Sequence, residues 1–304
     1  MASAARPGAT EDQQHSATDA FLTHRNLLFT VAYEMLGSAA DAEDVLQETW
    51  LRWADVEHAA IRDARAYLIR ITTRQALTRL RTLSRRKESY VGPWLPEPLL
   101  TAPDVAEDVE LAESVSIAML LVLETLTPTE RAVFVLREVF DVSYREIADA
   151  VDKSAATVRQ IAHRAREHVA ARRPRTGTTS AETKAALAAF QRAITTGEVQ
   201  DLVDILAPGV VAMGDGGGAR RVMPRPIVGA DKVARLLSAG IDAGGLLSFE
   251  PVLINGNPAL LSRVNGELDG VFTVRMEAGL ITGLFYVRNP AKLSRVEQST
   301  TISR

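Results

Sequence analysis

Apolar residues recur at three- to four-residue spacing over most of residues 18–173, which is the period of amphipathic helices. The stretch from Asp41 to Trp53 (DAEDVLQETWLRW) carries four apolar residues at this spacing and four carboxylates on the remaining surface. The stretch from Ala64 to Ser84 has the same period, with arginines on the side away from the apolar residues. The pattern predicts two packed helices, the first with an acidic face and the second with a basic face.

A second helical block runs from Val115 to Arg173. Thr127 and Pro128 have the pattern of an N-cap and a first helical position. Further on, the apolar period breaks at Asp152, which separates a short helix from a longer one that Ser154 caps. The predicted inner face of the longer helix comprises Val158, Ile161, Ala162, Ala165 and Val169. Two helices joined by so short a turn predict a helix-turn-helix.

After a linker over residues 174–180 the period changes. Helices are predicted over residues 181–196, 198–206 and 230–239. The segments LLSFEPVLING, PALLSRVNGE, GVFTVRME and LITGLFYVRN have the pattern of short strands separated by Asn-Gly, Gly and Pro turns. This order predicts an α+β domain with helices on one face of a curved sheet. The tail over residues 295–304 is expected to be disordered.

Residues 92–98 read GPWLPEP. Three prolines and a glycine are excluded from a helix interior, so we expect a stiff, extended strap followed by a flexible, acidic continuation. Trp94 lies within the strap, and a large aromatic side chain favours burial. Two partners remain open for it: the preceding helical domain, or the C-terminal domain near Asp215 to Gly218.

Composition is that of an ordinary soluble protein, with 46% hydrophobic and 24% charged residues. The chain has no cysteine, which excludes disulfides and thiolate metal sites. It also has no apolar run near the roughly eighteen residues of a membrane span, and its N-terminus lacks the apolar core of a signal peptide. We therefore expect a cytoplasmic protein without a membrane partner, a metal site or a cofactor.

The net charge of −3 conceals two basic patches. Residues 62–87 carry nine Lys and Arg against one acid, and residues 153–173 carry six against one. Residues 97–113, between them, hold six acids and no base. Because the field that a polyanion meets is screened within about 10 Å, the patches predict two separate contacts with nucleic acid. The alternative for each patch is a solvated helix face.

The second helix of the helix-turn-helix has a surface suited to the major groove. Small residues at its start permit close approach, Arg and Gln suit bidentate contacts with base edges, and flanking cations suit phosphates. The residues expected to contact DNA are Lys153, Ala155, Ala156, Arg159, Gln160, His163, Arg164 and Arg166.

The stretches DAEDVLQETWLRW, ARAYLIRITTRQALTRLR and LTPTERAVFVLREVFDVSYREIADAVDKSAATVRQIAHRAREHV resemble regions two and four of the extracytoplasmic-function (ECF) sigma factors of bacterial RNA polymerase. The resemblance implies two all-α sigma domains over residues 18–87 and 114–173, joined by a linker over residues 88–113. The implied partners are core polymerase, through its β′ clamp helices and β flap, and promoter DNA.

In that family the first helix binds core polymerase, the second melts and reads the minus-ten element, and the helix-turn-helix reads the minus-thirty-five element. The residues implied in core binding are Asp41, Glu43, Asp44, Gln47 and Glu48. Those implied in minus-ten recognition are Arg65, Arg70, Arg74, Gln75, Arg79 and Arg81. Trp50 and Trp53 are interpreted as core residues. Asp152 replaces a frequent Gly, and Thr78 replaces a common acid, which leaves the minus-ten preference open.

Residues 181–294 resemble the SnoaL-like domain, a cone-shaped α+β fold shared with ketosteroid isomerases and polyketide cyclases. A SigJ-type subgroup of ECF sigma factors carries such a domain with WLPEP, DGGGK-like and NPDKL-like motifs. Here Ala219 replaces the Lys of the second motif and Ala291 the Asp of the third. The interdomain regulatory residues that the resemblance implies are Trp94, Leu95, Pro96, Glu97, Pro98, Asp215, Gly216, Gly217, Gly218, Arg220, Asn289, Pro290, Lys292 and Leu293. Because WLPEP accompanies the extra domain, that domain is the favoured partner of Trp94.

The C-terminal domain is not expected to be an enzyme. Cone-shaped relatives use carboxylates, His or Tyr as acid and base, and no histidine follows His168. The remaining candidates, with no spacing that pairs them, are Asp215, Glu250, Glu267 and Asp269. A small ligand in a cavity of this domain is the preferred use.

The favoured hypothesis is thus a sigma factor whose C-terminal domain takes the place of a separate anti-sigma protein. Two alternatives are a DNA-binding module fused to an enzyme or ligand sensor, and a repressor that uses only the helix-turn-helix.

Overall fold

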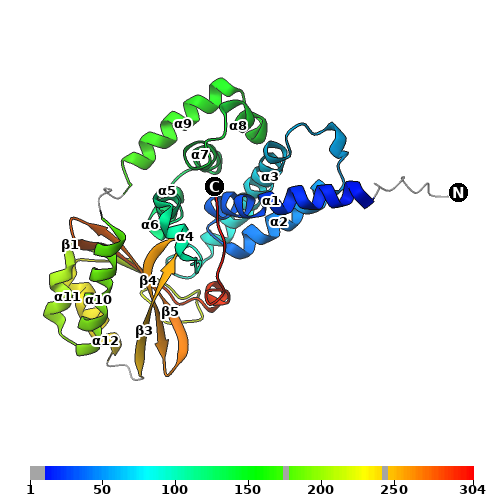
Figure 1. Ribbon diagram of the computed structural model, residues 1–304. Coiled ribbons are helices and arrows are strands. Elements are labelled where there is room, and N and C mark those ends of the chain that lie inside the picture. The colour runs from blue at the N-terminus through cyan, green and yellow to red at the C-terminus, as the bar shows by residue number, and fades with distance from the viewer. Residues whose placement is uncertain (1–10, 174–177, 242–245) are drawn as a thin grey trace. The chain divides into compact units, whose positions relative to one another are not determined.

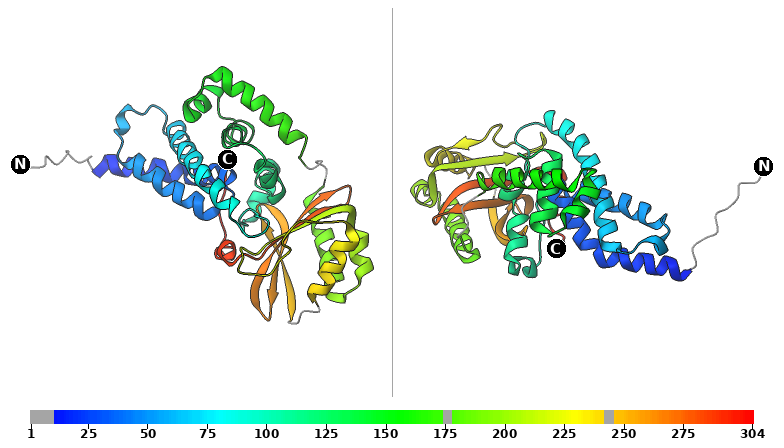
Figure 2. Two further views of the ribbon diagram at one scale, coloured as in Figure 1. Left: turned by 180° about the vertical axis from the view of Figure 1, so that it is seen from behind. Right: turned by 90° about the horizontal axis from the view of Figure 1, so that it is seen from above.

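The computed structural model describes residues 11–173, 178–241 and 246–304. They form two compact units, each described by itself below (Figures 1 and 2). The first unit comprises the chain up to Arg81 together with Pro128–His163 and Ile302–Arg304. The second comprises Thr82–Thr127 and Arg164–Thr301.

The first unit is helical, and α1 packs along α2. Its helices are α1 (Glu11–Leu36), α2 (Ala39–Ala54), η1 (His58–Ala60), α3 (Ala64–Glu88), α7 (Pro128–Phe134), the π-helical turn η2 (Val135–Val139), α8 (Tyr144–Val151) and α9 (Ala155–Ala170), of which α3 and α9 continue into the second unit. Trp53 is only 2% exposed, and its indole donates to the carbonyl of Ala17 at 2.8 Å. Its predicted place in the core is confirmed.

The predicted helix-turn-helix is confirmed as well. Helix α8 begins with a capping box between Ser143 and Glu146. It ends at Asp152, whose φ of 55° is left-handed, a conformation that Asp tolerates better than most residues. The hydroxyl of Ser154 accepts the amide of Thr157 at 3.1 Å and so caps α9. The five residues predicted for the inner face of α9 are all buried.

The second unit is built on a six-stranded sheet in the order β2-β1-β6-β5-β4-β3. Its strands are β1 (Leu206–Asp215), β2 (Ile227–Val228), β3 (Leu247–Ile254), β4 (Asn257–Val264), β5 (Glu267–Glu277) and β6 (Leu280–Val287). Neighbours are antiparallel except β1 and β6, which run parallel with Asp215 opposite Val287. The carboxyl ends of β1 and β6 therefore meet at the same edge of the sheet.

One face of this sheet is covered by helices, as predicted (Figure 1). These helices are α10 (Ser180–Thr196), α11 (Val199–Ile205) and α12 (Ala230–Ile241). Phe190 of α10 is fully buried, and its ring lies 5.5 Å from that of Phe272 on β5. This architecture confirms the expected α+β domain with helices on one face of the sheet.

The linker covers the other face of the sheet. Leu95 is fully buried in an apolar cluster with Ile117 and the sheet residues Val271 and Phe285. The backbone then pairs briefly with the edge of β3, where the amide of Thr101 donates to Leu253 at 3.0 Å. The linker is therefore a layer of the second unit.

Two expectations about irregular segments are wrong. The acidic continuation of the strap is helical, since Asp108 and Ser116 cap short helices whose apolar residues are buried. These helices are α4 (Pro103–Glu107), α5 (Val109–Ser114) and α6 (Ile117–Leu123). The tail after Ser294 is ordered: Val296 is fully buried and the amide of Thr300 donates to the carbonyl of Leu100 at 2.8 Å. In the described ranges no helix is long and apolar enough to cross a membrane.

Candidate functional site

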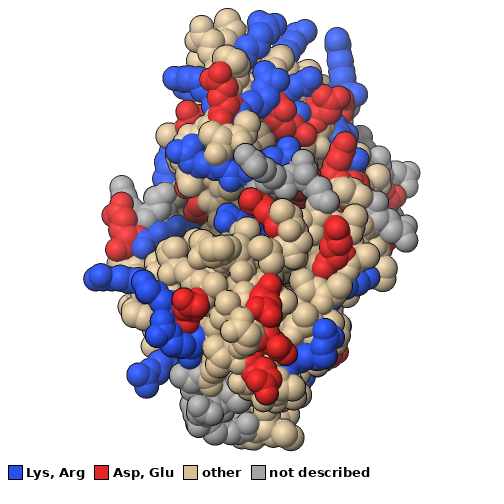
Figure 3. All heavy atoms as spheres, turned by 90° about the vertical axis from the view of Figure 1, so that its left-hand side faces the viewer, with Lys and Arg blue, Asp and Glu red and all other residues tan. Residues whose placement is uncertain are grey.

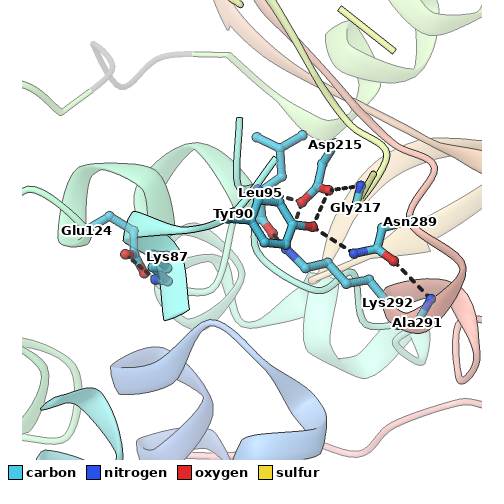
Figure 4. A network of polar contacts seen from close by, with 9 residues as sticks. All are labelled: Lys87, Tyr90, Leu95, Glu124, Asp215, Gly217, Asn289, Ala291 and Lys292. Carbon is cyan, nitrogen blue, oxygen red and sulfur yellow. Dashed lines mark hydrogen bonds and ion pairs between the residues drawn. The ribbon is translucent and has the colours of Figure 1, made fainter. Parts of the chain in front are cut away.

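A buried carboxylate joins the linker to the C-terminal domain (Figure 4). Asp215 ends β1 and is fully buried. Its Oδ1 accepts the hydroxyl of Tyr90 at 2.6 Å and the amide of Gly217 at 3.1 Å. Its Oδ2 accepts the amide of Leu95 at 2.9 Å and the ammonium of Lys292 at 2.7 Å. With four donors on two oxygens, the charge of Asp215 is fully compensated. We call Tyr90, Leu95, Asp215, Asn289 and Lys292 the latch.

Lys292 approaches from the short helix α13 (Pro290–Leu293), which Asn289 caps by accepting the amide of Ala291 at 3.0 Å. Its ammonium also donates to the carbonyl of Leu95 and lies 4.0 Å from the ring centroid of Trp94. Burial lowers the pKa of Lys292, and the Asp215 carboxylate acts in the opposite direction. One ammonium group thus contacts the strap and the end of β1 together.

Tyr90 is a member of the latch that the sequence did not indicate. Its hydroxyl donates to Asp215 and accepts the side-chain amide of Asn289 at 2.7 Å. Burial and the neighbouring Asp215 carboxylate raise the pKa of Tyr90, so that the phenol stays protonated and can donate. Tyr90 is 125 residues from Asp215 in the sequence, and its position next to GPWLPEP is the only sequence feature that could have indicated a role in the latch.

The glycines of the DGGG motif permit close approach of other groups. A Cβ on Gly217, which has a φ of 60°, would lie 2.4 Å from the side chain of Asn289. A Cβ on Gly216 would lie 2.0 Å from the carbonyl of Arg220. Since the amide of Gly217 is already donated to Asp215, the loop has the geometry of a contact surface and not of a phosphate cradle.

Trp94 and the residues that follow it in the strap differ in burial. Trp94 is half-buried and has two ammonium groups near its ring, that of Lys292 and that of Lys87, which lies 3.5 Å from the ring centroid. Lys87 in turn forms an ion pair with Glu124. Leu95, Pro96, Glu97 and Pro98 are buried, as is Leu293. Gly218 lies near Val91, whereas Arg220 is exposed and takes no part in the latch.

The outer face of α9 is open. Arg159, Gln160, His163, Arg164 and Arg166 are exposed, as are Lys153 and Ala156, whereas Ala155 is half-buried. In Figure 3 basic side chains gather over α8 and α9, with carboxylates between them. The helix-turn-helix therefore presents a cationic surface whose small and polar residues match those expected for DNA contact.

On α2 and α3, several residues predicted to have different partners contact one another. Arg79 of α3 pairs with Asp41 at 2.8 Å and with Asp44. Glu43 pairs with Arg25 at 2.8 Å. Gln47 and Glu48 are exposed, as are Arg65, Arg74 and Arg81, whereas Arg70 and Gln75 are half-buried. Asp41 and Arg79 therefore form part of the contact between α2 and α3.

Comparison with known proteins identifies the two helical regions. Residues 20–86 match Sigma-70 region 2, and residues 116–169 match Sigma-70, region 4. The ECF RNA polymerase sigma factor SigJ of Mycobacterium tuberculosis is 37% identical over 253 residues, covering 82% of this chain and 78% of SigJ. The chain belongs to the ECF family of RNA polymerase sigma factors. "Probable ECF RNA polymerase sigma factor SigI" of the same species is 34% identical over 285 residues, covering 92% of this chain and 96% of SigI.

This sigma factor shares more than the two sigma regions with its relatives. The crystal structure of M. tuberculosis SigJ superimposes with a TM-score of 0.72 at 31% identity, over 91% of this chain and 98% of that one. The likeness therefore extends into the C-terminal α+β domain. As an ECF sigma factor of the SigJ type, the protein directs RNA polymerase to promoters for the initiation of transcription.

The four carboxylates considered as acid–base candidates have different surroundings in the sigma factor. Asp215 belongs to the latch, and Glu250 is exposed on β3 beside Arg263 at 3.7 Å. Glu267 and Asp269 line a cavity of the C-terminal domain. There Asp269 accepts the hydroxyl of Tyr286, a pairing that no sequence spacing indicated. Sigma factors are not enzymes as a family.

Proposed function

We propose that the C-terminal domain regulates this sigma factor by holding the linker between regions 2 and 4, in the place of a separate anti-sigma protein. The observation that supports the proposal is the Asp215 carboxylate, which binds Tyr90 and Leu95 of the linker and Lys292 of the terminal motif. A linker held in this way has less freedom than a flexible tether, which limits how the two promoter-reading regions are spaced.

We propose that the exposed residues of α2 bind core polymerase through the β′ clamp helices, and that region 4 adds a contact with the β flap. On α3, Arg79 is committed to Asp41 and Asp44, and the guanidinium of Arg74 donates to the carbonyl of Asp149 at 2.7 Å. Arg65 and Arg81 are therefore the arginines that we expect to meet the minus-ten strand first.

A pocket of about 490 Å³ in the first unit supports strand recognition near α3. It is lined by residues of α3, among them Tyr67 and Arg70, by residues that precede this helix, and by two carboxylates of α8. An aromatic ring beside a guanidinium suits an extruded base and its phosphate. We propose that the minus-ten base enters here once the α8 carboxylates move away.

Replacing Arg159 with alanine is expected to weaken minus-thirty-five binding by about 1–3 kcal/mol and to relax its sequence preference, because a bidentate base contact is lost. Binding of holoenzyme to promoter duplexes with single substitutions would measure both. Arg192, which is exposed on α10, supplies the matched control Arg192→Ala. Equal effects of the two variants would contradict base reading by Arg159.

Run-off transcription with core polymerase tests regulation by the C-terminal domain. Deleting residues 181–304 is expected to change promoter activity while core binding persists. Because the deletion uncovers Leu95, the full-length variant Tyr90→Phe is a second test: it removes one charge-assisted hydrogen bond to Asp215, about 1.5–3 kcal/mol.

The matched control for Tyr90→Phe is Tyr286→Phe, which removes an equivalent bond to Asp269. Transcription that is unchanged in both the deletion and Tyr90→Phe would reject the proposed regulation. A change with Tyr286→Phe as large as with Tyr90→Phe would assign the effect to general loss of stability.

A further inference from the structure

The C-terminal domain contains a cavity of about 1020 Å³ to which the latch contributes no side chain. Apolar side chains from α10, α12 and the sheet line most of it, among them Ile194, Leu237, Phe249 and Phe272. The ring of Phe272 stacks on that of Tyr286 at 3.7 Å and 8°, and Phe249 lies 6.0 Å from Phe272. The volume and the aromatic wall suit a small molecule that contains rings.

One part of the cavity wall is polar. Asp269 is buried, and its two oxygens accept the hydroxyl of Tyr286 and the guanidinium of Arg288. Burial, with the hydrogen bond to Asp269, raises the pKa of Tyr286, so the phenol remains a donor to that carboxylate. Ser262 lies 3.1 Å from the same hydroxyl. Asp269 is thus satisfied within the protein and has little capacity for a cationic ligand.

Arg288 has donors that the protein does not use. Its NH1 donates to the carbonyl of Arg221 at 2.7 Å and its NH2 to Asp269. Its Nε is buried and has no hydrogen-bond partner among the residues that the structure describes. An unmet buried donor is costly, so the site favours a group that brings an acceptor.

The charged residues that line the cavity also favour a ligand that brings hydrogen-bond acceptors. Arg220 and Arg221 also line it, and both are exposed. With Asp269 already paired to Arg288, the remaining charges are two arginines against Glu267. The polar wall is therefore rich in donors and net positive, which favours an anion over a cation or a neutral molecule.

We propose that this cavity binds an aromatic carboxylate, with its carboxyl group on Arg288 and its rings against Phe249 and Phe272. Binding of such an acid does not depend on regulation through the latch, and a direct measurement keeps the two apart.

Calorimetric titration of the full-length protein with 2-naphthoate tests the proposal. We expect saturable binding that is at least tenfold tighter than that of the neutral analogue 2-naphthalenemethanol. Arg288→Gln is expected to abolish that difference. Arg275→Gln, on the same sheet but outside the cavity, is expected to leave it intact.

Leu237→Trp provides a test that leaves Arg288 in place, because the larger side chain fills the cavity from α12. It should weaken 2-naphthoate at least tenfold, whereas Val199→Trp at an exposed position of α11 should not. Absence of binding to the wild type, equal binding of the acid and the alcohol, or full binding to the folded Leu237→Trp protein would each overturn the proposal.

Discussion

The substitution Asp215→Ala is expected to lower the free energy of unfolding of the C-terminal domain by about 3–5 kcal/mol, because it leaves a buried ammonium without its counter-ion. Lys292 is 9% exposed, and its ammonium would still donate to the carbonyl of Leu95 but would lose the Asp215 carboxylate. The hydroxyl of Tyr90 and the amide of Leu95 would also lose their acceptor. Loss of the carboxylate therefore loosens the strap and the domain together.

Native-state hydrogen exchange of the β1 and β6 amides in the full-length protein would measure this loss. Glu250→Ala, which removes an exposed carboxylate from β3, is the matched control and should cost less than about 1 kcal/mol. The double variant Asp215→Ala/Lys292→Met should be more stable than Asp215→Ala alone, since the buried ammonium is removed together with the Asp215 carboxylate. If the double variant lost as much stability as the sum of the two single variants, the ion pair would have no coupling energy.

The substitution Gly217→Ala is expected to cost about 2–4 kcal/mol, from left-handed backbone strain together with a steric clash. The φ of Gly217 is 60°, and the added methyl group would lie 2.4 Å from the side chain of Asn289. Asn289 must then move away from Tyr90, which breaks the hydrogen bond between them and loosens the latch. Chemical denaturation and the transcription assay should both respond.

Gly266→Ala separates the clash from the strain. Gly266 has a φ of 86°, and no atom of the described part of the chain lies within 4 Å of the added methyl group. The control should therefore lose only about 1–2 kcal/mol and retain the transcription of the wild type. If both variants lost similar amounts of stability and transcription were unchanged, Asn289 would accommodate the methyl group of Gly217→Ala without disturbing the latch.

Local sequence spacing correctly predicts many helices and strands of the two units. Helix periodicity and caps predicted α2, α3, α8 and α9, and the predicted break at Asp152 is the turn between α8 and α9. The alternating strands and the helices on one face of the sheet also followed from pattern alone. Local periodicity reports which face of an element is buried, so these features need no tertiary information.

Local spacing does not predict which side chains form hydrogen bonds when they are far apart in sequence. Tyr90 meets Asp215 across 125 residues, and Asp269 meets Tyr286 on the next strand of the sheet. The GPWLPEP strap was expected to bury Trp94, but Leu95 is the side chain that the sheet buries fully, while Trp94 is half-buried with the ammonium groups of Lys87 and Lys292 near its ring. The sequence shows that the strap needs a partner surface and does not show which side chain enters it.

Local periodicity and motifs were thus enough to predict two helical regions, an extended linker motif and an α+β domain from the sequence. Only the tertiary structure decided that DGGG and NPAKL form one site. The two motifs follow β1 and β6, which are parallel neighbours, so the ends of both strands reach the same edge of the sheet. There the backbone amide of Arg288 donates to the carbonyl of Asp215 at 2.7 Å, and Lys292 reaches the carboxylate across 77 residues of sequence. Strand order, which local pattern does not encode, brings the two charges together.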